Sequence, residues 1–151
     1  MQRAVLALVL VIAVGAGVTA VAVGSGSTAK AKRSASVKLR STKLGRVAVD
    51  AHGRTLYLFE KDKHGKSACY GACAVAWPPA LVKGKPTGGA GISRLGTTTR
   101  RNGSHQLTLG GHPLYRFIKD KTPGDTKGQN VDAFGAEWYV VNGSGKKIEK
   151  H

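Results

Sequence analysis

Short runs of alternating apolar and polar residues recur along the chain from about residue 44, and glycine-bearing turns separate them. Such runs at this spacing are typical of a compact β fold. The predicted strands are 46–50, 55–59, 94–100, 106–109, 113–118 and 137–141. Beyond Val23 no long stretch has the apolar stripe of an amphipathic helix, so we expect a single short helix over 67–76. The fold class indicated is mainly β.

A different pattern marks the N-terminus, where an unbroken uncharged run, 4–23, follows Arg3. Its length lies between that of a long signal-peptide core and that of a membrane-spanning helix. We therefore predict that residues 1–23 are a signal peptide or an N-terminal membrane anchor, and both alternatives stay open. The positive charge after Val23 favours a cytoplasmic flank, whereas the cysteine pattern and the resemblance described below favour export.

Between this segment and the first strands, Ser, Ala, Gly and Lys dominate. Such a composition buries too little apolar surface to offset the entropy of ordering the chain. We therefore predict a flexible basic tether over 24–43. The β-rich domain then covers 44–148, and a short tail covers 149–151.

The chain contains an internal repeat. Residues 52–63 and 110–121 match at seven of twelve aligned positions without a gap, 58 residues apart. Two copies are too few for an open solenoid, so we expect two related units, about 44–82 and 92–141, to pack against each other as one small sheet or sandwich. Because side chains alternate along a strand, the Tyr and Phe of each copy share one face, and a leucine occupies the other.

Several linked motifs cover most of the predicted domain. They consist of Tyr57, Phe59, Asp62, Ser67, Cys69, Cys73, Trp77, Pro78 and Pro79, and then Pro113, Tyr115, Phe117, Asp120, Pro123, Asp125 and Gln129. In these motifs the chain closely resembles the bacterial secreted-repeat proteins and lipoproteins with a Yx(F/W/Y)xxD motif. The resemblance implies an extracytoplasmic repeat protein of unassigned molecular function. No cysteine precedes Cys69, so we expect no lipid-modified N-terminal cysteine here.

Cys69 and Cys73 are the two cysteines of the chain. On a helical turn their Cα atoms would lie about 6 Å apart, within the range that a disulfide bridges. In a small exported domain we expect them to form a structural disulfide on the short helix. The alternative is a redox-active or metal-binding pair with His64 as the nearest further ligand, although the redox spacing C-x-x-C is absent.

The aromatic and acidic motif residues have structural interpretations. Pro78 and Pro79 end the predicted helix, and Trp77 anchors it on the sheet. We assign Trp138 and Tyr139 to the core as well. The duplicated pair Asp62 and Asp120 is expected to accept hydrogen bonds from the turns that follow.

No catalytic constellation is visible in the sequence, which lacks G-x-S-x-G, H-E-x-x-H and a phosphate-binding G-x-x-x-x-G-K-[ST]. We therefore expect a protein that is not an enzyme and that carries no cofactor. A glycine-rich loop with Asp125, Asn130 and Asp132 offers oxygen ligands for calcium, but it lacks the ligand spacing of a defined calcium loop.

Charge adds an expectation about partners. The chain has 24 Lys and Arg against 8 Asp and Glu, a net charge of +16. A basic exported protein is suited to bind anionic envelope polymers or lipid headgroups. Specific nucleic-acid binding is not indicated, because the aromatic residues lie in apolar strands. Two hypotheses follow: a non-enzymatic binding module of the cell envelope, or a redox or metal-handling accessory protein that uses Cys69 and Cys73.

Overall fold

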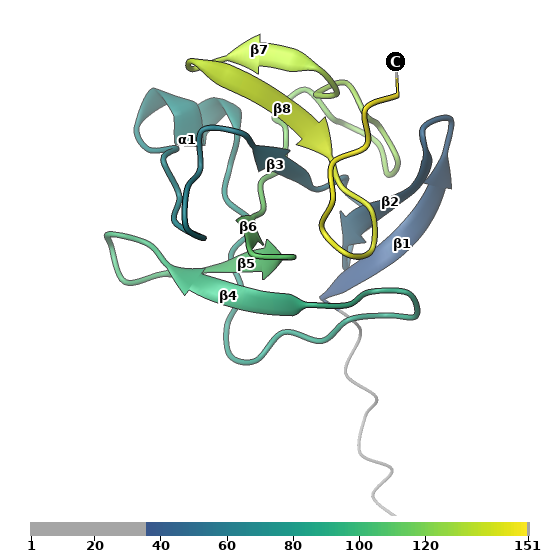
Figure 1. Cartoon of the computed structure of the whole chain (residues 1–151), viewed down its shortest axis with the longest axis horizontal. Helices are drawn as coiled ribbons and strands as arrows, with labels where there is room; N and C mark the ends of the chain where they lie inside the picture. Colours follow the sequence, from purple (N-terminus) through teal and green to yellow (C-terminus); the bar gives the residue numbers. More distant parts are fainter. Residues whose placement is uncertain (1–35, 151) are drawn as a thin grey trace, which may run out of the picture. The chain divides into compact units, whose positions relative to one another are not determined.

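A computed structural model describes residues 36–150, which form short strands and one short helix (Figure 1). The elements are β1 Val37–Thr42, β2 Gly45–Asp50, β3 Tyr57–Phe59, α1 Ala72–Ala76, β4 Leu95–Thr99, β5 His105–Leu109, β6 His112–Pro113, β7 Val131–Ala133 and β8 Ala136–Val140. The predicted membrane segment and most of the predicted tether lie outside the described residues. Within residues 36–150, the helix is too short to cross a membrane.

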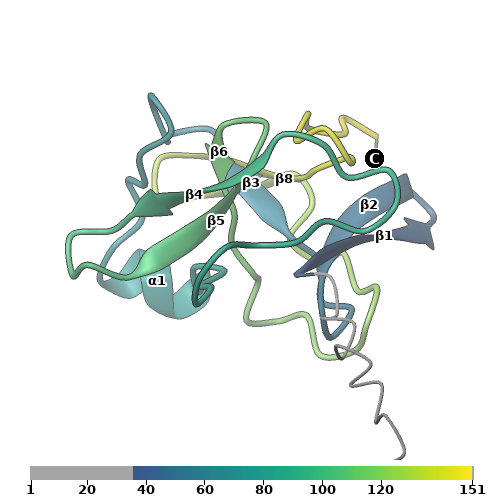
Figure 2. The same ribbon diagram turned by 90° about the horizontal axis from the view of Figure 1, so that it is seen from below.

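The strands form three small antiparallel sheets, in the orders β1-β2, β3-β8-β7 and β4-β5-β6. In two views at right angles, α1 and the β1–β2 hairpin lie at opposite ends of the domain (Figure 1, Figure 2). The mainly β class is confirmed, and the strands are divided among three sheets.

The two copies of the repeat meet through their tyrosines. The backbone N–H of Tyr57 donates to the carbonyl of Tyr115, and the N–H of Tyr115 donates to the carbonyl of Tyr57, both at 2.9 Å. This reciprocal pair places the equivalent residues of the two copies directly opposite each other. The expectation that the two units pack together is therefore confirmed.

The predicted strand 113–118 is largely wrong. Only its first residue lies in β6, because the chain then changes partners: Leu114 N–H donates to Leu107, Arg116 N–H to Pro78 and Ile118 N–H to Ala76. Together with the bond from Tyr115 N–H to Tyr57, these bonds reach three different segments, so they satisfy the backbone without forming a continuous ladder.

The start of the domain also differs from the prediction. The segment Val37–Thr42, assigned to the tether, forms β1 and pairs with β2 along its whole length. Val37 is fully buried, while its neighbour Lys38 is exposed. A single alternating run among serines and lysines is a weak signal, and pairing with β2 is what orders it.

Two apolar clusters form the core, one on each face of the repeated strand. The aliphatic cluster contains Leu56 and Leu114, and the aromatic cluster contains Tyr57, Phe59 and Tyr115. The alternation expected from the repeat therefore holds in both copies. The aromatic cluster is the one that carries the family motif, so the candidate site is built around it.

Candidate functional site

The tyrosines and aspartates of the repeated motif bond across the two copies. Tyr57 Oη donates to Asp120 Oδ2 at 2.6 Å, and Tyr115 Oη donates to Asp62 Oδ2 at 2.7 Å. In each copy the tyrosine hydroxyl therefore donates to the aspartate of the other copy, and the aspartate accepts from the tyrosine of the other copy. A buried phenol requires a hydrogen-bond partner. The tyrosine at the same position of both copies is therefore the sequence feature that could have pointed to this exchange.

The second oxygen of each carboxylate fixes a turn of its own copy. Asp62 Oδ1 accepts from the backbone N–H of Ala68 at 2.7 Å, and Asp120 Oδ1 accepts from that of Lys127 at 3.0 Å. The turn bonds expected from the sequence are therefore present. Each aspartate joins its own loop to the strand of the other copy.

Burial dominates the titration of this cluster. It raises the pKa of Asp62 to about 6, although the Ala68 N–H and the Tyr115 hydroxyl both favour the carboxylate. Burial also raises the pKa of Asp120, and burial together with the aspartate partners raises the pKa values of Tyr57 and Tyr115 well above 10. Both phenols therefore stay protonated and remain donors at neutral pH.

Four aromatic rings from the two copies form one continuous stack. Phe59 lies on Trp138 with ring centroids 4.0 Å apart, Trp138 on Trp77 at 3.9 Å, and Trp77 on Phe117 at 4.1 Å. Tyr57 meets Trp77 edge-on, and Tyr115 meets Trp138 edge-on. Trp77 and Trp138 are almost completely buried, so both belong to the core rather than to a ligand-binding surface.

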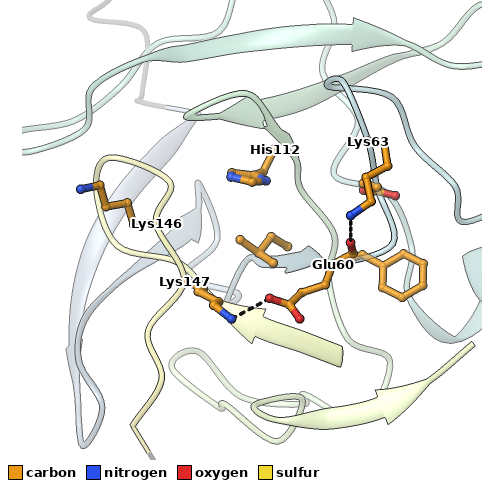
Figure 3. Close-up of a pocket in the computed structure, with 8 residues that line it drawn as sticks. Glu60, Lys63, His112, Lys146 and Lys147 are labelled. Atoms are coloured by element: carbon orange, nitrogen blue, oxygen red, sulfur yellow. Dashed lines mark hydrogen bonds and ion pairs between the residues drawn. The ribbon is translucent and has the colours of Figure 1, made fainter. Parts of the chain in front are cut away.

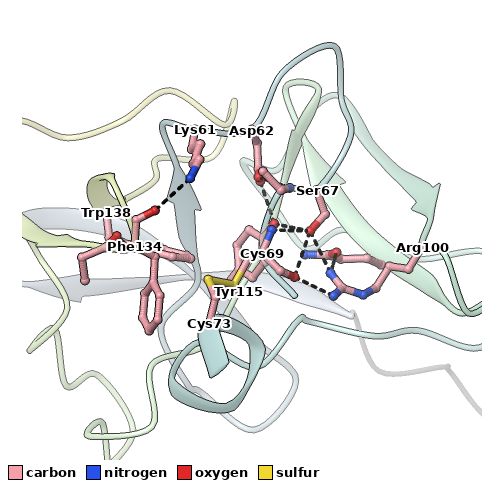
Figure 4. The surroundings of a disulfide bond; sticks show 12 residues. Lys61, Asp62, Ser67, Cys69, Cys73, Arg100, Tyr115, Phe134 and Trp138 are labelled. Atoms are coloured by element: carbon pink, nitrogen blue, oxygen red, sulfur yellow. Dashed lines mark hydrogen bonds between the residues drawn. A yellow bond between two sulfur atoms is a disulfide. The ribbon is translucent and has the colours of Figure 1, made fainter. Parts of the chain in front are cut away.

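Cys69 and Cys73 form a disulfide with their Cα atoms 5.3 Å apart (Figure 4). Cys73 lies on α1, and Cys69 lies in the turn that precedes it. Gly71, with φ of 57°, allows the tight entry into the helix. Both cysteines are buried, against the aromatic cluster.

Beside the disulfide lies a buried arginine that sequence reasoning missed (Figure 4). Arg100 is 7% exposed, and its guanidinium donates to the carbonyl of Cys69, to Gln106 Oε1 and to Ser67 Oγ at 2.7–2.9 Å. The Ser67 hydroxyl in turn contacts Tyr115 Oη at 2.8 Å. Arg100 therefore connects the β4–β5 hairpin to the Tyr–Asp cluster, and Ser67 of the motif serves this connection.

The candidate metal ligands do not converge. Within residues 36–150, no three His, Cys, Asp or Glu side chains are grouped closely enough to hold a metal ion. His64 lies exposed in a turn with φ of 52°, and both cysteine sulfurs are used in the disulfide. Asp125, a candidate calcium ligand, closes its own loop instead by accepting from Thr122 Oγ1 and from the backbone N–H of Lys121.

Two pockets lie beside the repeated strand, and their walls correspond at the 58-residue offset. The first has a volume of about 490 Å³ and is lined by Leu58, Phe59, Glu60, Asp62, Lys63, His112, Lys146 and Lys147 (Figure 3). The second has a volume of about 280 Å³ and is lined by Arg54, Thr55, Pro78, Arg116, Phe117, Ile118, Asp120 and Lys121. We call these pocket 1 and pocket 2.

The basic side chains of the two pockets have different partners. Two arginines that line pocket 2 are held from behind by Asp50, which does not line it: Asp50 pairs with Arg116 at 2.7 Å and with Arg54 at 3.2 Å, and this carboxylate is only 3% exposed. In pocket 1, Lys147 lies 2.7 Å from Glu60, while Lys63 donates to a backbone carbonyl. Among residues 36–150, Lys63 and Lys146 have no carboxylate within ion-pair distance.

Comparison with known proteins identifies one relationship. A family model described as a secreted repeat of unknown function matches residues 38–81 and 96–142, which correspond to the two copies of the repeat. No curated protein and no solved structure matches the chain.

Proposed function

The chain belongs to the secreted-repeat family of unknown function, and from this premise we propose that its domain is a non-enzymatic module that binds anionic polymers of the cell envelope. The family places the protein outside the cytoplasmic membrane. In this proposal the run 4–23 directs export and is either cleaved or kept as an anchor, and the basic residues that follow it add to the positive charge of the chain.

The observation that carries the proposal is an excess of cations that internal ion pairs do not use. Twenty of the 24 Lys and Arg residues lie within residues 36–150, together with all 8 acidic residues. Four of these cations pair with carboxylates in the described domain, namely Arg54, Arg116, Lys127 and Lys147. Most of the positive charge is therefore left to face the solvent or an anionic partner.

The acidic residues, in contrast, are largely occupied. Asp62 and Asp120 accept from tyrosines, and Glu137 accepts from the Tyr139 hydroxyl. The ion pairs described above occupy Asp50, Asp125, Glu60 and Glu149. Within residues 36–150, Asp132 and Glu137 are the exposed carboxylates without an ion pair, against 20 Lys and Arg residues in the same range.

The same occupancy supports the proposal of a non-enzymatic role. The two carboxylates with raised pKa values are the natural candidates for acid–base chemistry. Both hold a phenol of the opposite copy and a backbone N–H of their own turn. We therefore assign them to the architecture of the domain.

The test is retention of the purified full-length protein on isolated cell envelopes. We expect strong retention at low ionic strength and release near 1 M salt, where the Debye length falls to about 3 Å. Envelopes stripped of their anionic polymers serve as the control. Retention that survives high salt, or that is equal on stripped envelopes, contradicts the proposal.

A further inference from the structure

We propose that pocket 1 is the site at which the domain binds a phosphodiester group of a polyol-phosphate polymer. This inference rests on the proposed function and narrows it to one site and one ligand chemistry. It is carried by the difference between two pockets that arose from the same repeat.

The first difference concerns Asp50, whose carboxylate neutralises two arginines that line pocket 2. Asp50 faces Arg54 across a turn, with its N–H donating to the Arg54 carbonyl, and its carboxylate also holds Arg116. In the other copy, His112 takes the place of Arg54, and its backbone partner is Leu109, which is fully buried. The ion-paired triad of pocket 2 therefore has no counterpart in pocket 1.

The second difference concerns one pair of equivalent lining residues. Leu58 replaces Arg116 at the equivalent position, so an aliphatic side chain lines pocket 1 where pocket 2 has a paired guanidinium. Pocket 1 is also the larger of the two, and about 490 Å³ lies within the range of small-ligand sites. It has room for a polyol unit.

The third difference is the supply of cations. Figure 3 shows Lys63, Lys146 and Lys147 on different sides of His112. Glu60 and Glu149 both contact Lys147, which is therefore neutralised. Lys63 and Lys146 form no ion pair within residues 36–150, although Lys63 lies close enough to Asp62 to favour its carboxylate. A lysine ammonium binds phosphate as a point charge.

The acids of pocket 1 are compatible with such a ligand. Asp62 is occupied by Tyr115 and by the Ala68 N–H. Glu60 is paired with Lys147, and its side chain remains partly exposed. Its carboxylate can accept hydrogen bonds from the hydroxyl groups of a polyol. A ligand that places a phosphate at the lysines and a hydroxyl group at Glu60 is a polyol phosphate. A bare anion would use the lysines alone.

The experiment compares two double variants of the full chain with equal charge changes. Lys63→Gln with Lys146→Gln removes the two free cations of pocket 1. Lys121→Gln with Lys119→Gln removes the cation equivalent to Lys63 in pocket 2 and an exposed neighbour. Binding of soluble poly(glycerol phosphate) is measured by titration calorimetry, and thermal unfolding checks that both variants fold.

We expect the pocket 1 variant to lose about tenfold or more in affinity and the pocket 2 variant to lose less than about threefold. Equal losses overturn the site but leave the proposed function standing, whereas no binding by the unmodified protein overturns the proposed function. Binding to phosphatidylglycerol vesicles but not to the soluble polymer overturns the polymer as ligand. If equimolar inorganic phosphate displaces all of the bound polymer, the polyol part of the ligand does not contribute to binding, and that part of the proposal is overturned.

Discussion

At the scale of single residues, the Tyr-x-Phe-x-x-Asp motif describes three contacts that all involve the other copy. The tyrosine donates to the opposite aspartate, the phenylalanine stacks on the opposite tryptophan, and the aspartate accepts from the opposite tyrosine. The sequence predicted that these residues are buried and that the aspartates brace their turns. It did not reveal the exchange, because periodicity indicates a face and not the partner across it.

Tyr115→Phe is expected to lower the free energy of unfolding by about 2 kcal/mol, since the half-buried Asp62 loses its phenol donor. Urea unfolding measures the loss. Tyr57→Phe is the matched variant in the other copy, and a similar loss is expected there. A change below about 0.5 kcal/mol in both would contradict the structural role assigned to the exchange.

The raised pKa of Asp62 predicts a dependence of stability on pH. Its usual pKa is 3.8, and its value in the folded domain is about 6, so the folded state holds the proton more tightly. The contribution of Asp62 to stability is therefore full below about pH 4 and is lost as the pH rises through about 6. The difference in unfolding free energy between the protein and Asp62→Asn, measured from pH 4 to 8, should fall over this window. A flat difference would contradict it.

At the scale of elements, the strands whose sequences alternate clearly between apolar and polar residues were predicted. The strands that are ordered mainly by pairing with a neighbouring strand were not. The sequence indicated β2, β3, β4, β5 and β8, whereas β1 and β7 were missed. β7 is three residues long and joins β8 through the two-residue turn Phe134-Gly135, where both φ angles are positive. Phenylalanine is an unusual residue in such a turn, so no turn signal was visible.

Phe134→Asn is expected to stabilise the domain by about 1 kcal/mol. Phe134 is 43% exposed and has φ of 59°, and Asn-Gly is the preferred pair for a two-residue hairpin with positive φ. Thermal unfolding measures the gain. Phe134→Ala is the control, because it removes the same ring without favouring the turn, and an equal effect of both variants would refute the conformational explanation.

At the scale of the whole molecule, the repeat predicted that two units share a core, and the aromatic stack is the form that this core takes. The candidate site was less accessible to sequence reasoning. Lys146 and Lys147 lie more than 80 residues from Lys63, and no local pattern joins them. Arg100 was likewise hidden, since an arginine in a basic chain carries no sign of being buried.

Because rings of both copies alternate in the stack, we expect the domain to unfold in one transition. Tryptophan fluorescence reports the stack, and far-UV circular dichroism reports the sheets. The urea midpoints from the two signals should coincide. Separate midpoints would mean that one copy can stay folded after the other has opened.

The crossed Tyr–Asp bonds bear on how a protein of this kind can be assembled. A polypeptide with a single motif would hold one phenol without an acceptor and one carboxylate oxygen without its phenol donor, and its two aromatic rings would lack stacking partners from the other copy. A second molecule, rotated by half a turn, supplies all of them at once. We therefore expect a single-motif ancestor or relative to be a twofold homodimer, which gene duplication later converted into one chain.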